Sequence, residues 1–291
     1  MGTASQLQIS FLKALSKANI IGPIQLVHAF LLLMGIFLTY KQGWSLRFLL
    51  VWFASGQFCE MALTGLVAWR AGIRPAWPSR NFFWPTIRRS MPLGIANGLG
   101  NAIIRLDNII LAALATLPEL GAFSAANTLL AVFYVACWLF GSVLLPEMVR
   151  LSSSPEALRT YARKWALWIV STMTPCVLLV FWAAPKLVVL LYGPAFFRSG
   201  TLASTMALAC PLILLNSLCA NLAIATNSKS IYLGIFAATA ALTLGLDFFL
   251  GRGFGAIGVA AAIVIREAGM FGAFWLLMSR SPSPAAQVAI Q

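Results

Sequence analysis

The stretch GAFSAANTLLAVFYVACWLFGSVLL, which runs from Gly121 to Leu145, decides the fold. It contains no charged residue, and it is longer than the about 20 apolar residues that an α-helix needs to cross the hydrocarbon core of a bilayer. Its apolar residues are continuous rather than alternating with polar ones, which excludes a strand of a closed membrane barrel. The stretch therefore predicts a transmembrane helix.

The rest of the chain repeats this pattern. Of its residues, 60% are hydrophobic and only 9% are charged, and the mean hydropathy is +0.88, whereas soluble proteins carry about 25% charged residues. We predict an all-α, polytopic membrane protein with about eight transmembrane helices. The predicted spans lie near residues 21–40, 48–69, 91–115, 121–145, 165–185, 203–225, 231–250 and 256–278.

The net charge of +13 could suggest a nucleic-acid partner. However, the basic residues lie in short segments between the apolar runs, as they do in the cytoplasmic loops of membrane proteins. We therefore expect no nucleic-acid partner. The side that holds the N-terminus carries 13 of the lysines and arginines, against five on the other side. The positive-inside rule then predicts a multi-pass protein of the bacterial inner membrane with both termini in the cytoplasm.

Three segments lie outside the predicted spans. Residues 71–89 are rich in arginine, proline and aromatic residues, which predicts a basic cytoplasmic linker. Residues 281–291 are small and polar, which predicts a disordered cytoplasmic tail. Residues 1–19 are followed by an apolar run that is too long for a signal peptide and that lacks a small-residue cleavage pattern, so we expect no signal peptide.

The sequence contains no arrangement of residues that predicts catalysis. His28 is the single histidine, and Asp107 and Asp247 lie far apart, so neither a catalytic triad nor an acidic sugar-nucleotide motif can be built. The five cysteines lie in apolar runs without the spacing of a metal site. The motif Gly253–Gly258 matches GxGxxG but follows no strand, which favours a tight turn over a dinucleotide site. We expect neither an enzyme nor a metal or cofactor.

Charged residues inside the predicted spans are the informative feature. Each costs about 2.5–3.5 kcal/mol at mid-bilayer on insertion scales, so such residues usually face a cavity or a partner. They are Glu60, Arg105, Asp107, Arg266 and Glu267, with Asp247 near the end of a span.

Span 91–115 is the clearest case. Its polar residues Asn97, Asn101, Arg105 and Asn108 fall within an arc of about 80° at 100° per residue. We expect this stripe to face the interior of the helix bundle near mid-membrane, with an acid such as Glu60 or Glu267 nearby. It could line a water-filled cavity or hold helices together. Asp107 projects elsewhere, towards a partner on another helix.

Four stretches, in this order and spacing, resemble the polysaccharide flippase family of the multidrug/oligosaccharidyl-lipid/polysaccharide exporter superfamily. They are Ser90-Met-Pro-Leu-Gly with Arg105-Leu-Asp-Asn-Ile-Ile-Leu, then Glu119-Leu-Gly-Ala-Phe-Ser-Ala-Ala-Asn127, then Pro146-Glu-Met-Val-Arg-Leu, and finally the pair Leu190-Leu-Tyr-Gly193 and Gly253-Phe-Gly-Ala-Ile-Gly-Val-Ala-Ala.

This resemblance implies two six-helix lobes and alternating access around a central cavity. The implied substrate is an undecaprenyl-diphosphate-linked oligosaccharide for surface polysaccharide synthesis. The resemblance assigns residues 90–280 to a complete second lobe and residues 1–70 to the last two helices of the first. We therefore expect four helices of the first lobe to be missing from this chain.

The resulting hypothesis is a lipid-linked oligosaccharide flippase whose partners are its substrate, membrane lipids and glycan polymerases or glycosyltransferases. Two other hypotheses remain, namely a cation-coupled multidrug exporter of the same superfamily and a non-transporting scaffold of a glycan-assembly complex. We predict that the substrate cavity is lined by Asn97, Asn101, Arg105, Asn108 and Arg266. We predict that charge balance or ion coupling is provided by Glu60, Asp107 and Glu267.

Overall fold

The computed structural model describes residues 21–280 except 44, 71 and 73–78. The predicted disordered tail and the N-terminal segment fall outside the described residues, as does most of the first half of the predicted linker. All the described elements are helices, and they divide into two units, Met1–Phe82 and Phe83–Gln291. The prediction of an all-α, polytopic membrane protein is confirmed.

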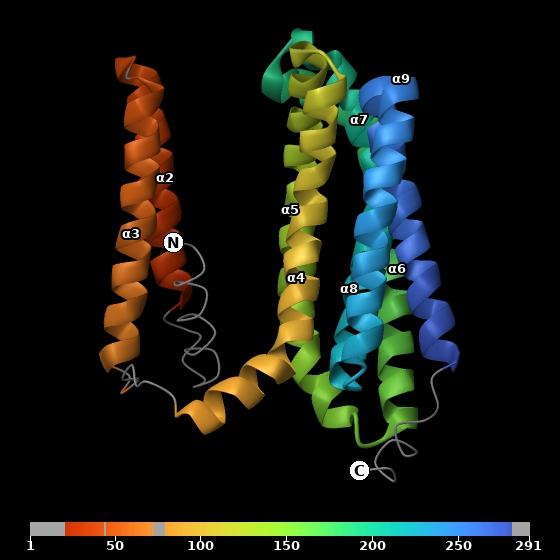
Figure 1. The fold of residues 1–291 in the computed structure, drawn as a ribbon. Helices are drawn as coiled ribbons and strands as arrows, with labels where there is room; N and C mark the ends of the chain where they lie inside the picture. The colour runs from red at the N-terminus through yellow and green to blue at the C-terminus, as the bar shows by residue number, and fades with distance from the viewer. Residues whose placement is uncertain (1–20, 44, 71, 73–78, 281–291) are drawn as a thin grey trace. The chain divides into compact units, whose positions relative to one another are not determined.

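The first unit contains a hairpin of two helices, α2 (Ile21–Gln42) and α3 (Leu46–Arg70) (Figure 1). The two helices approach closely where Gly35 of α2 lies against the indole of Trp52. The indole Nε1 of Trp52 donates a hydrogen bond to the Leu31 carbonyl oxygen at 2.8 Å. Most of the large apolar side chains of this hairpin are exposed, as expected for helices surrounded by lipid.

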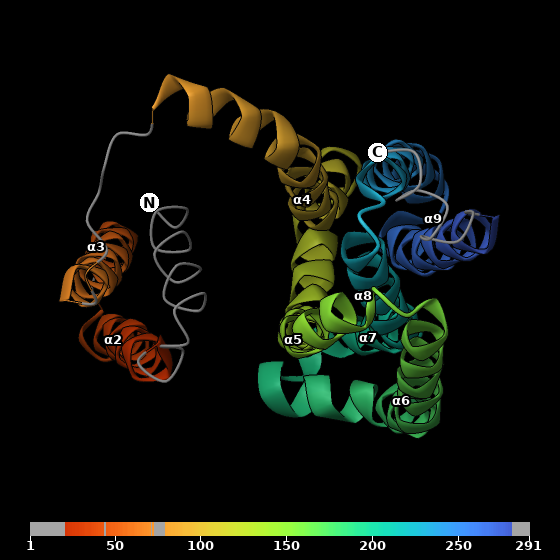
Figure 2. The same ribbon diagram turned by 90° about the horizontal axis from the view of Figure 1, so that it is seen from below.

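The second unit is a bundle around the short helix α8 (Cys210–Ala225), which packs against α5, α6 and α9 (Figure 2). The other elements of the bundle are α4 (Arg80–Leu114), α5 (Leu117–Leu151), α6 (Pro155–Tyr192), η2 (Pro194–Phe196), α7 (Phe197–Ala207) and α9 (Lys229–Arg280). Two core clusters hold the bundle together, a large one that includes Phe123 and Met148 and a smaller one around Phe274.

Each of the eight predicted spans coincides with these helices, except for residue 115 after the end of α4 and the break at 208–209 between α7 and α8. Spans seven and eight are the two halves of α9, which turn back on each other at Gly255 (φ 63°, ψ −143°) (Figure 1). Span six is a pair, α7 and α8, bent by 40° at Leu208–Ala209. Pro211 lies in the first turn of α8, where its missing N–H costs least.

Length and apolar composition alone mark four of the described helices as able to cross a membrane, or five if the bent pair is one span. The helix α4 is outside that group because its apolar run is interrupted by polar residues. It begins at Arg80, so residues 80–89 of the predicted linker are helical. Those first turns lie at an angle to the rest of α4 (Figures 1 and 2), and Pro85 and Pro92 are the residues inside the helix that can bend it.

Candidate functional site

The helix α4 presents two chemically different faces. Arg105 and Asp107 are two residues apart, which is about 200° around a helix, so the two side chains point to opposite sides. Asp107 is 2% exposed and lies inside the second unit. Arg105 is exposed on the surface of that unit.

The polar stripe follows Arg105 on the exposed face. Asn97 and Asn101 are exposed and Asn108 is half-buried. Asn97 Oδ1 accepts a hydrogen bond from the Tyr232 hydroxyl at 2.9 Å, and the side-chain amide of Asn101 donates to the Asn97 carbonyl oxygen at 2.9 Å. The guanidinium of Arg105 forms neither a salt bridge nor a hydrogen bond with any residue that the structure describes.

The prediction that Arg105 and its stripe face the interior of the second unit is therefore wrong. Only one side of α4 can pack against the bundle, and Asp107 occupies that side because it finds a buried counter-charge there. The expectation that Glu267 lies near Arg105 is wrong for the same reason, and the expectation for Glu60, which belongs to the first unit, stays a prediction. Glu267 belongs to the interior cluster, and Glu60 lies on α3 beside His28.

That counter-charge is Arg266, in the second half of α9. Its Nη1 lies 2.7 Å from Asp107 Oδ1, and its side chain is 1% exposed. Glu267 Oε1 lies 3.5 Å from Arg266 Nε, which is an ionic contact rather than a short hydrogen bond. The side-chain amide of Asn216 on α8 donates to Glu267 Oε2 at 2.8 Å. A charged cluster therefore joins α4, α8 and α9 inside the bundle.

Asp247 is the member of this cluster that the sequence analysis did not assign to the site. It is fully buried at the end of the first half of α9, and its carboxyl lies beside that of Asp107. Neither carboxylate oxygen meets a hydrogen-bond donor from the residues that the structure describes. The sequence does carry a signal for it, because Thr239, Thr243 and Asp247 recur every four residues and form one buried polar stripe.

In the first unit, Glu60 is buried and pairs with the single histidine. Glu60 Oε2 lies 3.3 Å from His28 Nδ1, and the side-chain amide nitrogen of Gln57 lies 3.2 Å from His28 Nε2. The pair joins α2 to α3. The nearest polar partner of Glu60 therefore lies within its own hairpin.

The turn predicted at Gly253–Gly258 is confirmed. Gly255 has the positive φ that a sharp reversal needs, and Glu119 at the start of α5 accepts a hydrogen bond from the Ala256 backbone N–H at 2.7 Å. This carboxylate lies at the N-terminus of the second half of α9, where backbone N–H groups lack partners and negative charge is favourable. Glu119 and the glycine motif both belong to the stretches on which the family resemblance rests, and here they are in contact.

No group of three or more histidine, cysteine or acidic side chains arranged to hold a metal ion occurs within the described part of the chain. The cysteines there are free thiols, four of them buried or half-buried in apolar surroundings. None of these residues offers a place for a metal or a covalent cofactor.

Fold and site together define a multi-pass helical membrane protein with one polar, cationic helix face and a buried charge cluster. Among solved structures, the chain is similar to the lipid II flippase MurJ in its inward closed conformation, with a TM-score of 0.73 and 13% sequence identity. The similarity covers 96% of this chain and 60% of that one, so the chain spans about 60% of the length of its structural relative.

No family model and no curated protein sequence matches the chain. The structural likeness shows that the chain has the fold of a solved lipid-linked flippase. A likeness at this identity does not separate a polysaccharide flippase from a lipid II flippase. The solved relative is a transporter rather than an enzyme.

Proposed function

We propose that the chain acts in flipping a lipid-linked oligosaccharide of the undecaprenyl-diphosphate type across the bacterial inner membrane. A sugar headgroup and a diphosphate must then cross about 30 Å of hydrocarbon, and they need polar groups in place of water. The observation that carries the proposal is the exposed stripe of α4, in which an unpaired guanidinium lies among three asparagines.

The stripe has the chemistry that such a headgroup requires. The planar fork of Arg105 suits the oxygens of a diphosphate, and asparagine amides can both donate to and accept from sugar hydroxyls. Arg105 is nine residues from the end of α4 at Leu114, or about 14 Å at 1.5 Å per residue. An unpaired guanidinium at that depth needs polar surroundings, and a polar translocation path would supply them.

The buried cluster has a different role in this proposal. Arg266 is enclosed and already in contact with Asp107, so we retain Arg105 rather than Arg266 as the residue that contacts the substrate. Asp107 and Glu267 balance the charge of Arg266, and Glu60 contacts His28 within the first unit. The cluster thereby fixes which face of α4 points out of the bundle.

The two alternative functions, drug exporter and scaffold, predict a different chemistry for the exposed face of α4. A cation-coupled drug exporter would need an acidic, aromatic surface, whereas this stripe has one cation, three amides and no carboxylate. A scaffold without transport activity predicts lipid-facing or paired intramembrane charges. Arg105 has no partner among the described residues, and the three amides beside it favour a polar path over contact with lipid. The stripe therefore favours an anionic, hydroxyl-rich substrate.

Reconstitution of the purified chain in proteoliposomes tests the proposal. A fluorescent undecaprenyl-diphosphate oligosaccharide is placed in both leaflets, and an impermeant quencher reports the fraction that reaches the outer one. We expect protein-dependent flipping of this lipid and no cation-driven efflux of a cationic dye. Efflux of the dye without flipping of the lipid would favour the drug exporter and contradict the proposal.

A further inference from the structure

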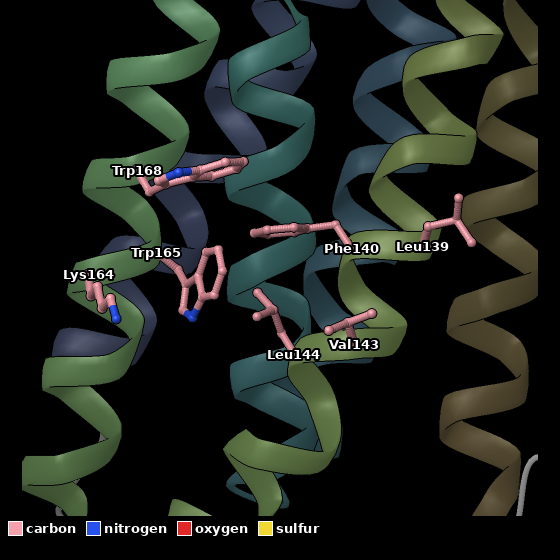
Figure 3. A pocket seen from close by; sticks show the side chains of 7 residues that line it. All are labelled: Leu139, Phe140, Val143, Leu144, Lys164, Trp165 and Trp168. Atoms are coloured by element: carbon pink, nitrogen blue, oxygen red, sulfur yellow. The ribbon is translucent and has the colours of Figure 1, made fainter. Parts of the chain in front are cut away.

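A groove on the outside of the second unit lies between α5 and α6. The two helices are joined by the short connection 152–154, and α8 packs against both of them, which leaves a concave surface on the outer side. The groove has a volume of about 790 Å³, within the range of about 300–1,000 Å³ that is usual for ligand pockets. It is lined by Leu139, Phe140, Val143, Leu144, Lys164, Trp165 and Trp168 (Figure 3).

The groove floor is aromatic and fixed by ring contacts. The rings of Phe140 and Trp168 are stacked with centroids 6.1 Å apart, and Trp165 meets both of them edge-on. The rim is open, with 73% of Val143 and 53% of Leu139 exposed. A flexible hydrocarbon chain could lie along this floor without any movement of the bundle.

One end of the groove is polar. Figure 3 shows the amine of Lys164 and the indole nitrogen of Trp165 at the same end, with Trp168 farther along. The Trp165 Nε1–H is buried and meets no hydrogen-bond acceptor within the described residues. Buried indole N–H groups usually have a partner, so this one indicates an acceptor that the described residues do not supply.

The charge at this end points to an anionic ligand. Arg150, Arg159, Arg163 and Lys164 lie around the connection between α5 and α6, and Lys164 is the one that lines the groove. Lys164 directly precedes the predicted span 165–185. Lys164 is therefore expected where lipid headgroups meet hydrocarbon. A ligand with a phosphate beside a long apolar chain matches both ends of the groove.

We propose that this groove binds one anionic phospholipid of the surrounding bilayer. Its phosphate contacts Lys164 and accepts the Trp165 Nε1–H, and one acyl chain lies along Phe140 and Trp168. The commonplace role of interfacial tryptophans is to anchor a helix at the headgroups. Such anchors need neither a concave floor nor a buried N–H without an acceptor. The proposal does not depend on the transported substrate.

Native mass spectrometry of the full chain tests the proposal. The protein is purified in detergent with equal amounts of phosphatidylglycerol, phosphatidylcholine and undecaprenyl phosphate, and the retained lipid is counted. We expect one phosphatidylglycerol per chain in the wild type and at least a tenfold loss in Lys164→Gln. Arg163→Gln, which removes the neighbouring exposed charge outside the groove, is the matched control and should retain it.

A second variant separates the apolar part of the site from its charge. Val143→Trp fills the rim of the groove and leaves Lys164 in place, and we expect it to lose the retained lipid as well. Equal retention by the wild type and Lys164→Gln would overturn the proposal. So would an equal loss in Arg163→Gln, or retention of undecaprenyl phosphate in place of phosphatidylglycerol.

Discussion

Arg266 and Asp107 form a salt bridge of 2.7 Å between two side chains that are almost wholly buried, although the residues are 159 positions apart in the chain. The pair joins the first helix of the second unit to the last. It therefore sets the rotation of α4, with Asp107 facing inwards and Arg105 facing outwards. The proposed substrate face thus depends on a contact on the opposite side of the same helix.

Loss of either partner of this pair should destabilise the second unit. Asp107→Ala leaves the guanidinium of Arg266 buried without its closest counter-charge, for which we expect a loss of about 3–5 kcal/mol. Thermal unfolding of the purified protein in detergent, followed by size-exclusion chromatography, measures it. The double variant Asp107→Leu with Arg266→Met should be more stable than Asp107→Ala. If the single variant unfolds at the wild-type temperature, the pair does not hold α4 in place.

The cap at the α9 turn gives a second prediction. Glu119→Ala removes the acceptor of the Ala256 N–H, and we expect a loss of about 1–2 kcal/mol, as for other N-terminal caps. Glu147→Ala is the matched control, because Glu147 also lies on α5 but pairs only with the exposed Arg150. We expect little change there, since exposed ion pairs contribute little. Equal effects of the two variants would contradict the capping role.

The same turn predicts a steric effect at Gly258. A Cβ at this position would clash with the Leu250 carbonyl oxygen, so Gly258→Ala must push the two halves of α9 apart. We expect a loss of about 1–3 kcal/mol, the usual cost of overpacking. Gly245→Ala in the same helix meets no atom within 4 Å and should be neutral or slightly stabilising. A melting temperature of Gly258→Ala at or above that of Gly245→Ala would show that the turn is not as close as described.

The orientation in the membrane is a separate prediction. Figure 1 shows that the α5–α6 connection, the α8–α9 connection and the C-terminal end of α9 lie at one end of the second unit. The basic residues Arg150, Arg163, Lys164 and Lys229 lie near these connections. We expect this end to be cytoplasmic. A reporter that is active only in the cytoplasm should be active when it is fused at Gln291. Activity of a reporter that works only in the periplasm would show that the topology is the reverse.

The membrane fold could be predicted from the sequence because it depends on composition alone. Each apolar run is long enough to span a bilayer whatever it packs against, so all eight predicted spans lie in helices. The glycine turn at Gly253–Gly258 could also be predicted, because no other use of that motif fits a helical protein. These are local properties of the chain.

The candidate site could be predicted only in part. The spacing of the asparagines with Arg105 located the polar stripe, but not the direction in which it faces. That direction depends on whether Arg105 or Asp107 finds a partner, and the partner, Arg266, lies far away in the sequence. The sequence indicates a buried position for Asp247 only through its four-residue spacing from Thr239 and Thr243.

Flipping assays of Arg105 variants test directly whether the exposed stripe of α4 contacts the substrate. In the proteoliposome assay, Arg105→Ala should slow flipping of the lipid-linked oligosaccharide about ten- to hundredfold, because a hydrogen bond to a charged group contributes about 1.5–3 kcal/mol. Arg105→Lys should fall between this variant and the wild type, since it keeps the charge and loses the planar fork. Both variants should have the melting temperature of the wild type, because the exposed Arg105 side chain forms no hydrogen bond or salt bridge with the described residues.

Arg88→Ala is the matched control, because Arg88 is an exposed arginine on the same helix but outside the stripe. This variant should flip the lipid at the wild-type rate. We expect that only the Arg105 variants lose transport, and that their stability is unchanged. A wild-type rate of flipping by Arg105→Ala would contradict this expectation.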